Sequence, residues 1–133
     1  FIFYILYKEN NFRKKKYLIN LMEILKKKNL KESIDKILIK YPDKIPVFVH
    51  RSSKDKNLID LKCSKFIVPD SITLAQFMVI IRKRLKIQSD QALFIFINNN
   101  IPVSSESMRT IYEKYKNKDG MLMIEYCGEN VFG

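Results

Sequence analysis

The sequence predicts an α+β fold in which a four-stranded mixed sheet holds one long helix across a face, with two additional helices at the N-terminal end. The first observation behind this prediction is the order of patterns along the chain, which is strand, strand, helix, strand, helix, strand. The second is size, because 133 residues, 47% of them hydrophobic, supply one modest core. The third is that no internal repeat divides the chain. Together they predict a single domain.

Two helical stripes precede the first strand. Apolar residues recur at helical spacing within residues 18–25 and again within residues 30–41. We expect the second helix to end there, because Pro42 disfavours helical geometry at the residue before it. Met22 is the first methionine, so residues 1–21 are set apart as an extension that is either native or upstream sequence.

A strand pair and a helix follow. Residues 46–49 and 65–68 are β-rich runs separated by a charged loop, and they predict an antiparallel pair. Thr73 and Gln76 have the spacing of a capping box, which predicts the start of a helix.

The predicted helix has one narrow apolar stripe. Val79 and Ile80 lie off that stripe. Apolar residues outside the core face either meet another element or line an exposed apolar patch, so these two residues are a first indication of a binding surface. The stripe itself consists of Leu74, Phe77, Met78, Ile81 and Leu85.

The last third of the chain supplies two strands and a helix. Residues 93–97 are apolar at every position, which predicts a central strand contacted on both faces. A helical stripe within 108–115 and a β-rich run at 121–126 follow. A sheet with a strand pair first and a strand last is typical of a ubiquitin-like β-grasp domain, here spanning 22–126. Residues 127–133 have neither periodicity nor bulk, which predicts a flexible C-terminal tail.

The charge of the chain narrows the classes of binding partner. The formal net charge of +11 favours anionic lipid, acidic peptide or nucleic acid as a partner.

The few possible metal ligands predict no metal site. Cys63, Cys127 and His50 are too few to form a structural zinc site, and free thiols suit the cytoplasm. His50 and Cys63 also lack a third group to orient them as base and nucleophile. No metal, cofactor or catalytic residue is therefore predicted. The apolar run at residues 1–7 is far shorter than the roughly 20 residues needed to span a bilayer.

Several blocks of the sequence resemble, in order, the autophagy ubiquitin-like modifier family, which includes GABARAP and its yeast counterpart. Each block alone is a weak signal, but together they are specific and cover approximately residues 30–133. The blocks are Lys40-Tyr41-Pro42-Asp43-Lys44-Ile45-Pro46-Val47, Lys65-Phe66-Ile67-Val68-Pro69, Gln76-Phe77, Ile81-Arg82-Lys83-Arg84-Leu85, Ala92-Leu93-Phe94-Ile95-Phe96-Ile97-Asn98-Asn99, Tyr112-Glu113, Lys118-Asp119-Gly120 and Glu129-Asn130-Val131-Phe132-Gly133.

The resemblance implies a modifier and not an enzyme. Gly133 would be activated by a ubiquitin-type activating enzyme, passed to a conjugating enzyme and joined to phosphatidylethanolamine. Most family members carry residues after this glycine that a cysteine protease removes, and a deconjugating cysteine protease is a further implied partner. Glycine suits this position, because it has no side chain to obstruct a narrow enzyme cleft. Either the protein is encoded ready for conjugation or the chain was cut at Gly133. The implied location is cytoplasmic and, after lipidation, the autophagosome membrane, or a plastid membrane as in some parasite lineages.

The resemblance also implies that cargo receptors bind through short acidic aromatic-x-x-aliphatic motifs, which add a strand beside residues 65–69. Ile80 then has a role that explains its place off the helix stripe, whereas Phe77 suits the core equally well. The implied aromatic pocket consists of Ile37, Pro46, Lys65, Ile67 and Met121. The implied aliphatic pocket consists of Phe66, Val68, Pro69, Ile72, Phe77 and Ile80.

Three basic residues, Lys44, Lys65 and Arg84, would steer the acidic flanks of such peptides. Three departures from the family pattern bear on this prediction, the first of which is Ser33, where the family often has Glu. Met121 stands where the family has Phe, and Cys63-Ser64 stand where two further basic residues are common. Because Met is more adaptable than Phe, we expect different preferred ligands and a weaker pull on acidic peptides.

Two alternatives to conjugation remain at this point. One is a ubiquitin-like adaptor that binds peptides or microtubules without being conjugated. The other is a nucleic-acid-binding domain, which basic charge together with aromatic residues would suit. Nucleic acid is the less favoured partner, because the sequence has no recognised nucleic-acid motif and its aromatic residues sit mainly at core-type positions.

Overall fold

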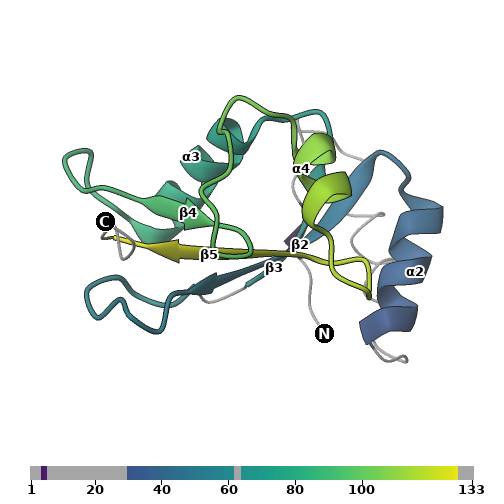
Figure 1. The fold of residues 1–133 in the computed structure, drawn as a ribbon, viewed down its shortest axis with the longest axis horizontal. Helices are drawn as coiled ribbons and strands as arrows, with labels where there is room; N and C mark the ends of the chain where they lie inside the picture. Colours follow the sequence, from purple (N-terminus) through teal and green to yellow (C-terminus); the bar gives the residue numbers. More distant parts are fainter. Residues whose placement is uncertain (1–3, 6–29, 62–63, 129–133) are drawn as a thin grey trace.

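The computed structural model describes residues 4–5, 30–61 and 64–128, which form the three helices and five strands labelled or coloured in Figure 1. The predicted helix at residues 18–25 lies outside the described residues, whereas every other predicted element is present. The elements are β1 (Tyr4–Ile5), α2 (Leu30–Lys40), β2 (Lys44–Arg51), β3 (Lys65–Pro69), α3 (Leu74–Leu85), β4 (Phe94–Phe96), α4 (Met108–Tyr115) and β5 (Leu122–Cys127).

The strands form one mixed sheet in the order β1-β3-β2-β5-β4. β2 is antiparallel to β3, with Pro46 opposite Ile67, which confirms the predicted antiparallel pair. β2 is parallel to β5 in the middle of the sheet, and β4 is antiparallel to β5. The four predicted strands are all in this sheet. β1 is an addition, because two paired residues are too short a run to show a periodicity in the sequence.

The position of β4 corrects one prediction. The all-apolar run at residues 93–97 was interpreted as a central strand, but β4 lies at the edge of the described sheet and pairs with β5. Ile95 and Phe96 are nevertheless 4% and 1% exposed, and Phe94 is partly exposed. An apolar run therefore indicated burial correctly, but burial does not distinguish a central strand from a covered edge strand.

Local signals explain where the helices and turns begin and end. The capping box of α3 is confirmed, since the Gln76 amide donates to Thr73 Oγ1 at 3.2 Å and the Thr73 amide donates to Gln76 Oε1 at 2.9 Å. Asn98 and Asn99 both have positive φ, 50° and 63°, in the turn that follows β4. Asparagine tolerates this left-handed conformation better than most residues. None of the described helices is long and apolar enough to cross a membrane.

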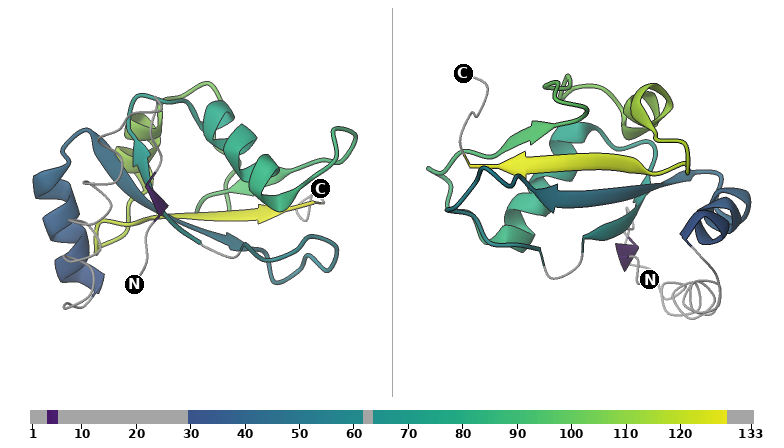
Figure 2. Two further views of the ribbon diagram at one scale, coloured as in Figure 1. Left: turned by 180° about the vertical axis from the view of Figure 1, so that it is seen from behind. Right: turned by 60° about the horizontal axis from the view of Figure 1, so that its bottom comes forward.

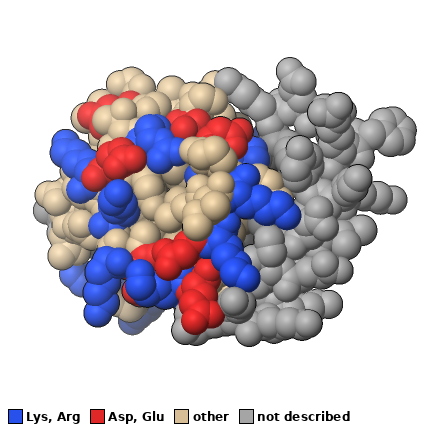
Figure 3. All heavy atoms as spheres, turned by 90° about the vertical axis from the view of Figure 1, so that its right-hand side faces the viewer, with Lys and Arg blue, Asp and Glu red and all other residues tan. Residues whose placement is uncertain are grey.

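The helices cover the sheet unequally. In Figure 1 and in both views of Figure 2, α3 and α4 lie together on one side of the sheet, whereas α2 stands apart at one end. Figure 3 shows the face on the α2 side, where basic side chains are interspersed with acidic ones. The ion pair between Lys31 and Asp35, one turn apart on α2 with N to O 3.9 Å, belongs to this mixed pattern. Such a face is not a continuous basic field.

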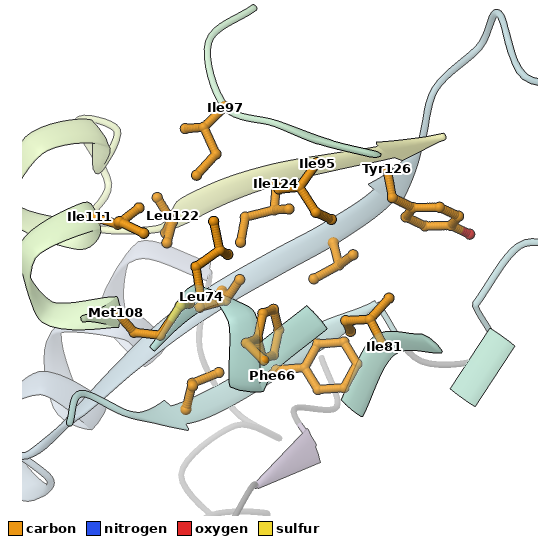
Figure 4. Close-up of a cluster of buried hydrophobic side chains, with 14 of the residues drawn as sticks. Phe66, Leu74, Ile81, Ile95, Ile97, Met108, Ile111, Leu122, Ile124 and Tyr126 are labelled. Atoms are coloured by element: carbon orange, nitrogen blue, oxygen red, sulfur yellow. The ribbon is translucent and has the colours of Figure 1, made fainter. Parts of the chain in front are cut away.

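The buried side chains form two clusters. The large cluster lies between the sheet, α3 and α4, and Figure 4 shows Phe66, Ile81 and Met108 among the side chains that point into it. The second, which we call the α2 cluster, comprises the buried residues Ile34, Ile37, Tyr41, Ile67 and Met121. Neighbouring residues of β3 and β5 are divided between the two clusters, as expected for strands whose successive side chains point to opposite faces.

Candidate functional site

The two predicted pockets meet on β3. Phe66 and Val68 belong to the large cluster, whereas Ile67 between them belongs to the α2 cluster. Because side chains alternate along a strand, Lys65 and Ile67 share the α2 face, and Phe66 and Val68 share the α3 face. The two pockets therefore lie on opposite faces of the sheet.

The residues predicted for the aromatic pocket gather on the α2 face. Ile37, Ile67 and Met121 are members of the α2 cluster, and each is at most 2% exposed. Pro46 is buried on β2, directly opposite Ile67. Lys65 is half-buried at the start of β3. The structure thus brings all five residues together, four of them within the core.

Five of the six residues predicted for the aliphatic pocket lie on the α3 face, whereas Pro69, which follows Val68, falls on the α2 face because side chains alternate along β3. The Phe66 and Phe77 rings meet edge to face with centroids 5.8 Å apart, and both side chains are fully buried. Phe77 is therefore a core residue, as its place on the helix stripe predicted. Ile80 packs against the large cluster while only partly buried, whereas its neighbour Val79 is 50% exposed. The other members are all buried: Val68, Pro69 and Ile72.

This arrangement has a geometric consequence for an added strand. Positions i and i+3 of an extended peptide point to opposite faces. A residue opposite Lys65 would face the α2 cluster, and a residue three positions later, opposite Val68, would face the large cluster. In a peptide that runs parallel to β3, the first of these two positions would therefore lie on the side of the α2 cluster and the second on the side of the large cluster.

The three predicted steering charges surround this edge. Lys44 is opposite Pro69 at one end of the β2–β3 pair, and Lys65 is near the other end. The Lys65 Nζ lies 5.8 Å from the centroid of the Phe48 ring. The Arg84 guanidinium lies 5.4 Å from the centroid of the Phe66 ring, so the side chain extends from α3 toward β3. Contact with these rings holds the two charged groups beside the edge of β3, while the aliphatic parts of the side chains pack against apolar surface.

The outer edge of β3 already carries a strand. β1 pairs with β3 in parallel, with Tyr4 opposite Phe66 and Ile5 opposite Ile67. The edge that the predicted docking uses is therefore geometrically able to accept a parallel strand. Sequence reasoning missed β1, and the only available signal was the apolar run at residues 1–7, which was considered as a membrane or signal segment.

A second region, at the end of β5, contains a polar network that the sequence did not predict. Asp55 is 5% exposed and accepts hydrogen bonds at Oδ1 from the amides of Asn57, at 2.7 Å, and Leu58, at 3.0 Å. Its Oδ2 accepts a hydrogen bond from the Gly128 amide, 73 residues later. The predicted tail begins at Cys127, but that residue is still part of β5 and Gly128 is held by Asp55. We call these contacts the Asp55 clamp.

The Asp55 clamp favours the ionised carboxylate. Burial raises the pKa of Asp55, but the hydrogen bonds from Gly128, Leu58 and Asn57 and the charge of Arg51 together hold that pKa below its ordinary value. The Arg51 guanidinium also donates to the carbonyls of Asp55, at 3.0 Å, and Leu58, at 3.1 Å. The loop after β2 is therefore tied both to its own strand and to the first residue beyond β5.

A third set of contacts lies beside the Pro69 end of β3, whose outer edge along Lys65–Pro69 we call the docking edge after the predicted strand addition. Arg109, in the first turn of α4, donates from Nε to Asp70 Oδ2 at 3.0 Å and from Nη2 to the Pro42 carbonyl at 2.8 Å. It therefore joins the turn before β2 to the turn after β3. These contacts span 39 and 67 residues, so no local pattern in the sequence could have revealed them.

Several other predicted site residues can be located only in part. Gly133 and Cys63 lie outside the described residues. Cys127, on β5, is buried. His50 lies on β2, with its ring centroid 5.7 Å from that of Phe48. Within residues 30–61 and 64–128, no three His, Cys, Asp or Glu side chains are placed to hold a metal ion.

Comparison with protein families gives one clear match. The family model described as "Autophagy protein Atg8 ubiquitin like" matches residues 28–133. The match includes both clusters, the docking edge and the Asp55 clamp, while Tyr4 and Ile5 precede it.

Individual proteins similar to this chain are also Atg8 proteins. The chain is 45% identical over 104 residues to "Autophagy-related protein 8" of Schizosaccharomyces pombe, covering 77% of this chain and 84% of that protein. It is 44% identical over 94 residues to "Autophagy-related protein 8d" of Arabidopsis thaliana, covering 71% and 78%. Among solved structures, "Crystal Structure of Trypanosoma brucei ATG8" is similar, with a TM-score of 0.71 and 29% identity over 94% of this chain and 100% of that one.

Proposed function

Since the chain belongs to the Atg8 family of ubiquitin-like autophagy proteins, which are modifiers and not enzymes, we propose that Gly133 is joined to phosphatidylethanolamine and that the β3 edge recruits receptors. The partners would be a ubiquitin-type activating enzyme, a conjugating enzyme, a deconjugating cysteine protease and cargo receptors with acidic aromatic-x-x-aliphatic motifs. The site of action would be the autophagosome membrane, or a plastid membrane.

The position of Gly128 supports the conjugation half of this proposal. Gly128 is fixed to the folded domain through Asp55, and Gly133 follows five residues later. Five residues reach at most about 18 Å when fully extended. A lipid joined to Gly133 would therefore hold the domain close to the bilayer, where basic side chains add about 1 kcal/mol each against an anionic surface.

Reconstitution tests the conjugation half. The chain, activating and conjugating enzymes, ATP and phosphatidylethanolamine liposomes are combined, and lipid addition is measured by mass spectrometry. We expect an adduct on the unaltered chain, none on Gly133→Ala, and an adduct on the control Asn130→Ala, which changes the same segment but keeps Gly133. An adduct of equal yield on Gly133→Ala would refute the requirement for glycine at this position, and an adduct that mass spectrometry maps to another residue would refute attachment at Gly133.

The alternation of β3 between the two clusters is the observation that carries the docking half. An aromatic side chain would enter beside the α2 cluster and an aliphatic one beside the large cluster, while backbone groups of the peptide pair with the edge of β3. Lys44, Lys65 and Arg84 would raise the rate of encounter with acidic flanks.

Peptide titration tests the docking half. We expect an acidic aromatic-x-x-aliphatic peptide to lose about tenfold or more in affinity on Ile80→Asp, because a charge would enter an apolar contact, a penalty of at least 1.4 kcal/mol. The matched control is Val79→Asp, one residue along the same helix at a 50% exposed position, which should bind normally. Lys65→Ala should weaken binding in low salt more than Lys83→Ala, which is exposed on the last turn of α3. Equal binding by Ile80→Asp and Val79→Asp would place the peptide elsewhere.

A further inference from the structure

The β3 edge accommodates a strand of the chain's own N-terminal segment. Tyr4 and Ile5 pair in parallel with Phe66 and Ile67 and extend the sheet on the side away from β2. Backbone groups along an open sheet edge favour pairing with another strand. β1 therefore occupies part of the surface that the proposed docking needs.

Orientation and register both match those of a docked peptide. A peptide with its aromatic residue opposite Lys65 and its aliphatic residue opposite Val68 has to run parallel to β3, and β1 does. Its two middle residues would lie opposite Phe66 and Ile67, which are the partners of β1.

The sequence around β1 fits the same pattern. The four residues Phe3-Tyr4-Ile5-Leu6 read aromatic-x-x-aliphatic, with the paired dipeptide in the middle. Within residues 1–21, however, Glu9 is the only acidic residue, and five residues are basic: Lys8, Arg13, Lys14, Lys15 and Lys16. The segment therefore lacks the acidic flank that would complement the steering charges.

We propose that β1 is an internal ligand of the β3 edge and that receptor peptides bind by displacing it. This proposal rests on the docking function proposed above. β1 satisfies the edge of the sheet when no receptor is present, and an acidic peptide has the electrostatic advantage when both compete. Peptides whose motifs lack acidic flanks would then compete poorly with β1 and bind more weakly.

With this competition, the apparent Kd of a receptor peptide equals its intrinsic Kd divided by the fraction of molecules whose edge is open. If β1 covers about nine-tenths of the molecules, the apparent Kd of a receptor peptide is about tenfold higher than for an uncovered edge. Removing β1 should therefore tighten binding, which is the opposite of what damage to a binding site would do.

The test uses the full chain carrying Tyr4→Pro and Ile5→Pro, because proline removes backbone donors and is disfavoured within strands. Asn10→Pro with Asn11→Pro is the matched control, with the same substitutions outside β1. An acidic aromatic-x-x-aliphatic peptide is titrated by calorimetry, and hydrogen exchange is followed at the amides of residues 66–68. We expect binding about threefold or more tighter in the first variant, together with faster exchange in the absence of peptide. The control should match the unaltered chain.

A second variant, Phe3→Ser with Leu6→Ser, keeps every backbone donor and removes only the aromatic-x-x-aliphatic pattern. It should also bind the peptide more tightly. Equal affinity in the unaltered chain and both variants, with binding that still depends on Ile80, overturns the competition and leaves docking intact. Absence of peptide binding in all chains overturns docking and the competition with it.

Discussion

The docking edge at β3 and the Asp55 clamp at the end of β5 are held by different forces. The docking edge is built from apolar side chains of neighbouring elements, which alternate between two clusters. The clamp is one buried carboxylate that gathers amides from its own loop and from Gly128. Apolar burial is non-directional and survives small shifts, whereas a buried carboxylate depends on each donor being in place. We therefore expect the clamp to fail first when the pH falls below 3.8, and the docking edge to fail only with the fold.

The largest expected loss of stability comes from a change in the apolar core that supports the docking edge. Phe77→Ala should lower the free energy of unfolding by about 3 to 5 kcal/mol, because it leaves a cavity beside Phe66 in the large cluster. Chemical denaturation measures it. Val79→Ala on the same helix should cost less than about 0.5 kcal/mol, since its side chain is half exposed. Equal costs would mean that the edge is not supported by the core.

The next largest effect is on the clamp. Asp55→Ala should cost about 2 to 3 kcal/mol, because the amides of Asn57, Leu58 and Gly128 lose their acceptor. Asp60→Ala is the control, as its side chain is 74% exposed in its contact with Arg51. Hydrogen exchange at Gly128 should accelerate in the Asp55 variant alone. Unchanged exchange at Gly128 would show that the clamp does not hold the end of β5.

A smaller loss of stability is expected when one hydrogen bond between β5 and the loop after β2 is removed while the core packing is kept. The Tyr126 hydroxyl donates to the Ile59 carbonyl at 2.7 Å, which joins β5 to the same loop as the clamp. Tyr126→Phe keeps the ring in the large cluster and should cost about 1 kcal/mol. Tyr115→Phe is the control, because its hydroxyl makes no hydrogen bond with the described residues. A cost above that of Asp55→Ala would reverse the ranking of the two contacts.

The smallest effect is a pH dependence of the clamp. Because the pKa of Asp55 in the folded chain lies below its ordinary value of 3.8, the unfolded chain takes up the proton first as the pH falls. The stabilisation is therefore complete above about pH 4 and is lost as the pH falls below 3.8 toward the folded-state pKa. Denaturation of the unaltered chain and of Asp55→Asn between pH 2 and 6 (roughly the range of carboxyl titration) should give curves that converge at the acid end. A constant separation would contradict the linkage.

Most of the architecture could be predicted from local patterns. The capping box at Thr73, the β-rich run at residues 65–68 and the apolar stripe of α3 each lie within a few residues, and each is present in the structure. The central position assigned to residues 93–97 was wrong, because a covered edge strand is as apolar as a central one. The membership of Ile37, Phe66 and Ile67 in the two pockets came from family resemblance, and the structure places Ile37 and Ile67 in the α2 cluster and Phe66 in the large cluster.

Local patterns in the sequence were sufficient to predict the described helices and strands other than β1, because hydrophobic periodicity and capping act over one or two turns. The folded arrangement was needed to show that β1 lies on the docking edge, that Arg109 joins two distant turns and that Asp55 accepts a hydrogen bond from the amide of Gly128. The hydrogen bonds join residues that are 39 to 73 positions apart, and β1 is a strand of only two residues. Neither leaves a local pattern in the sequence, because such contacts depend on how the whole sheet packs.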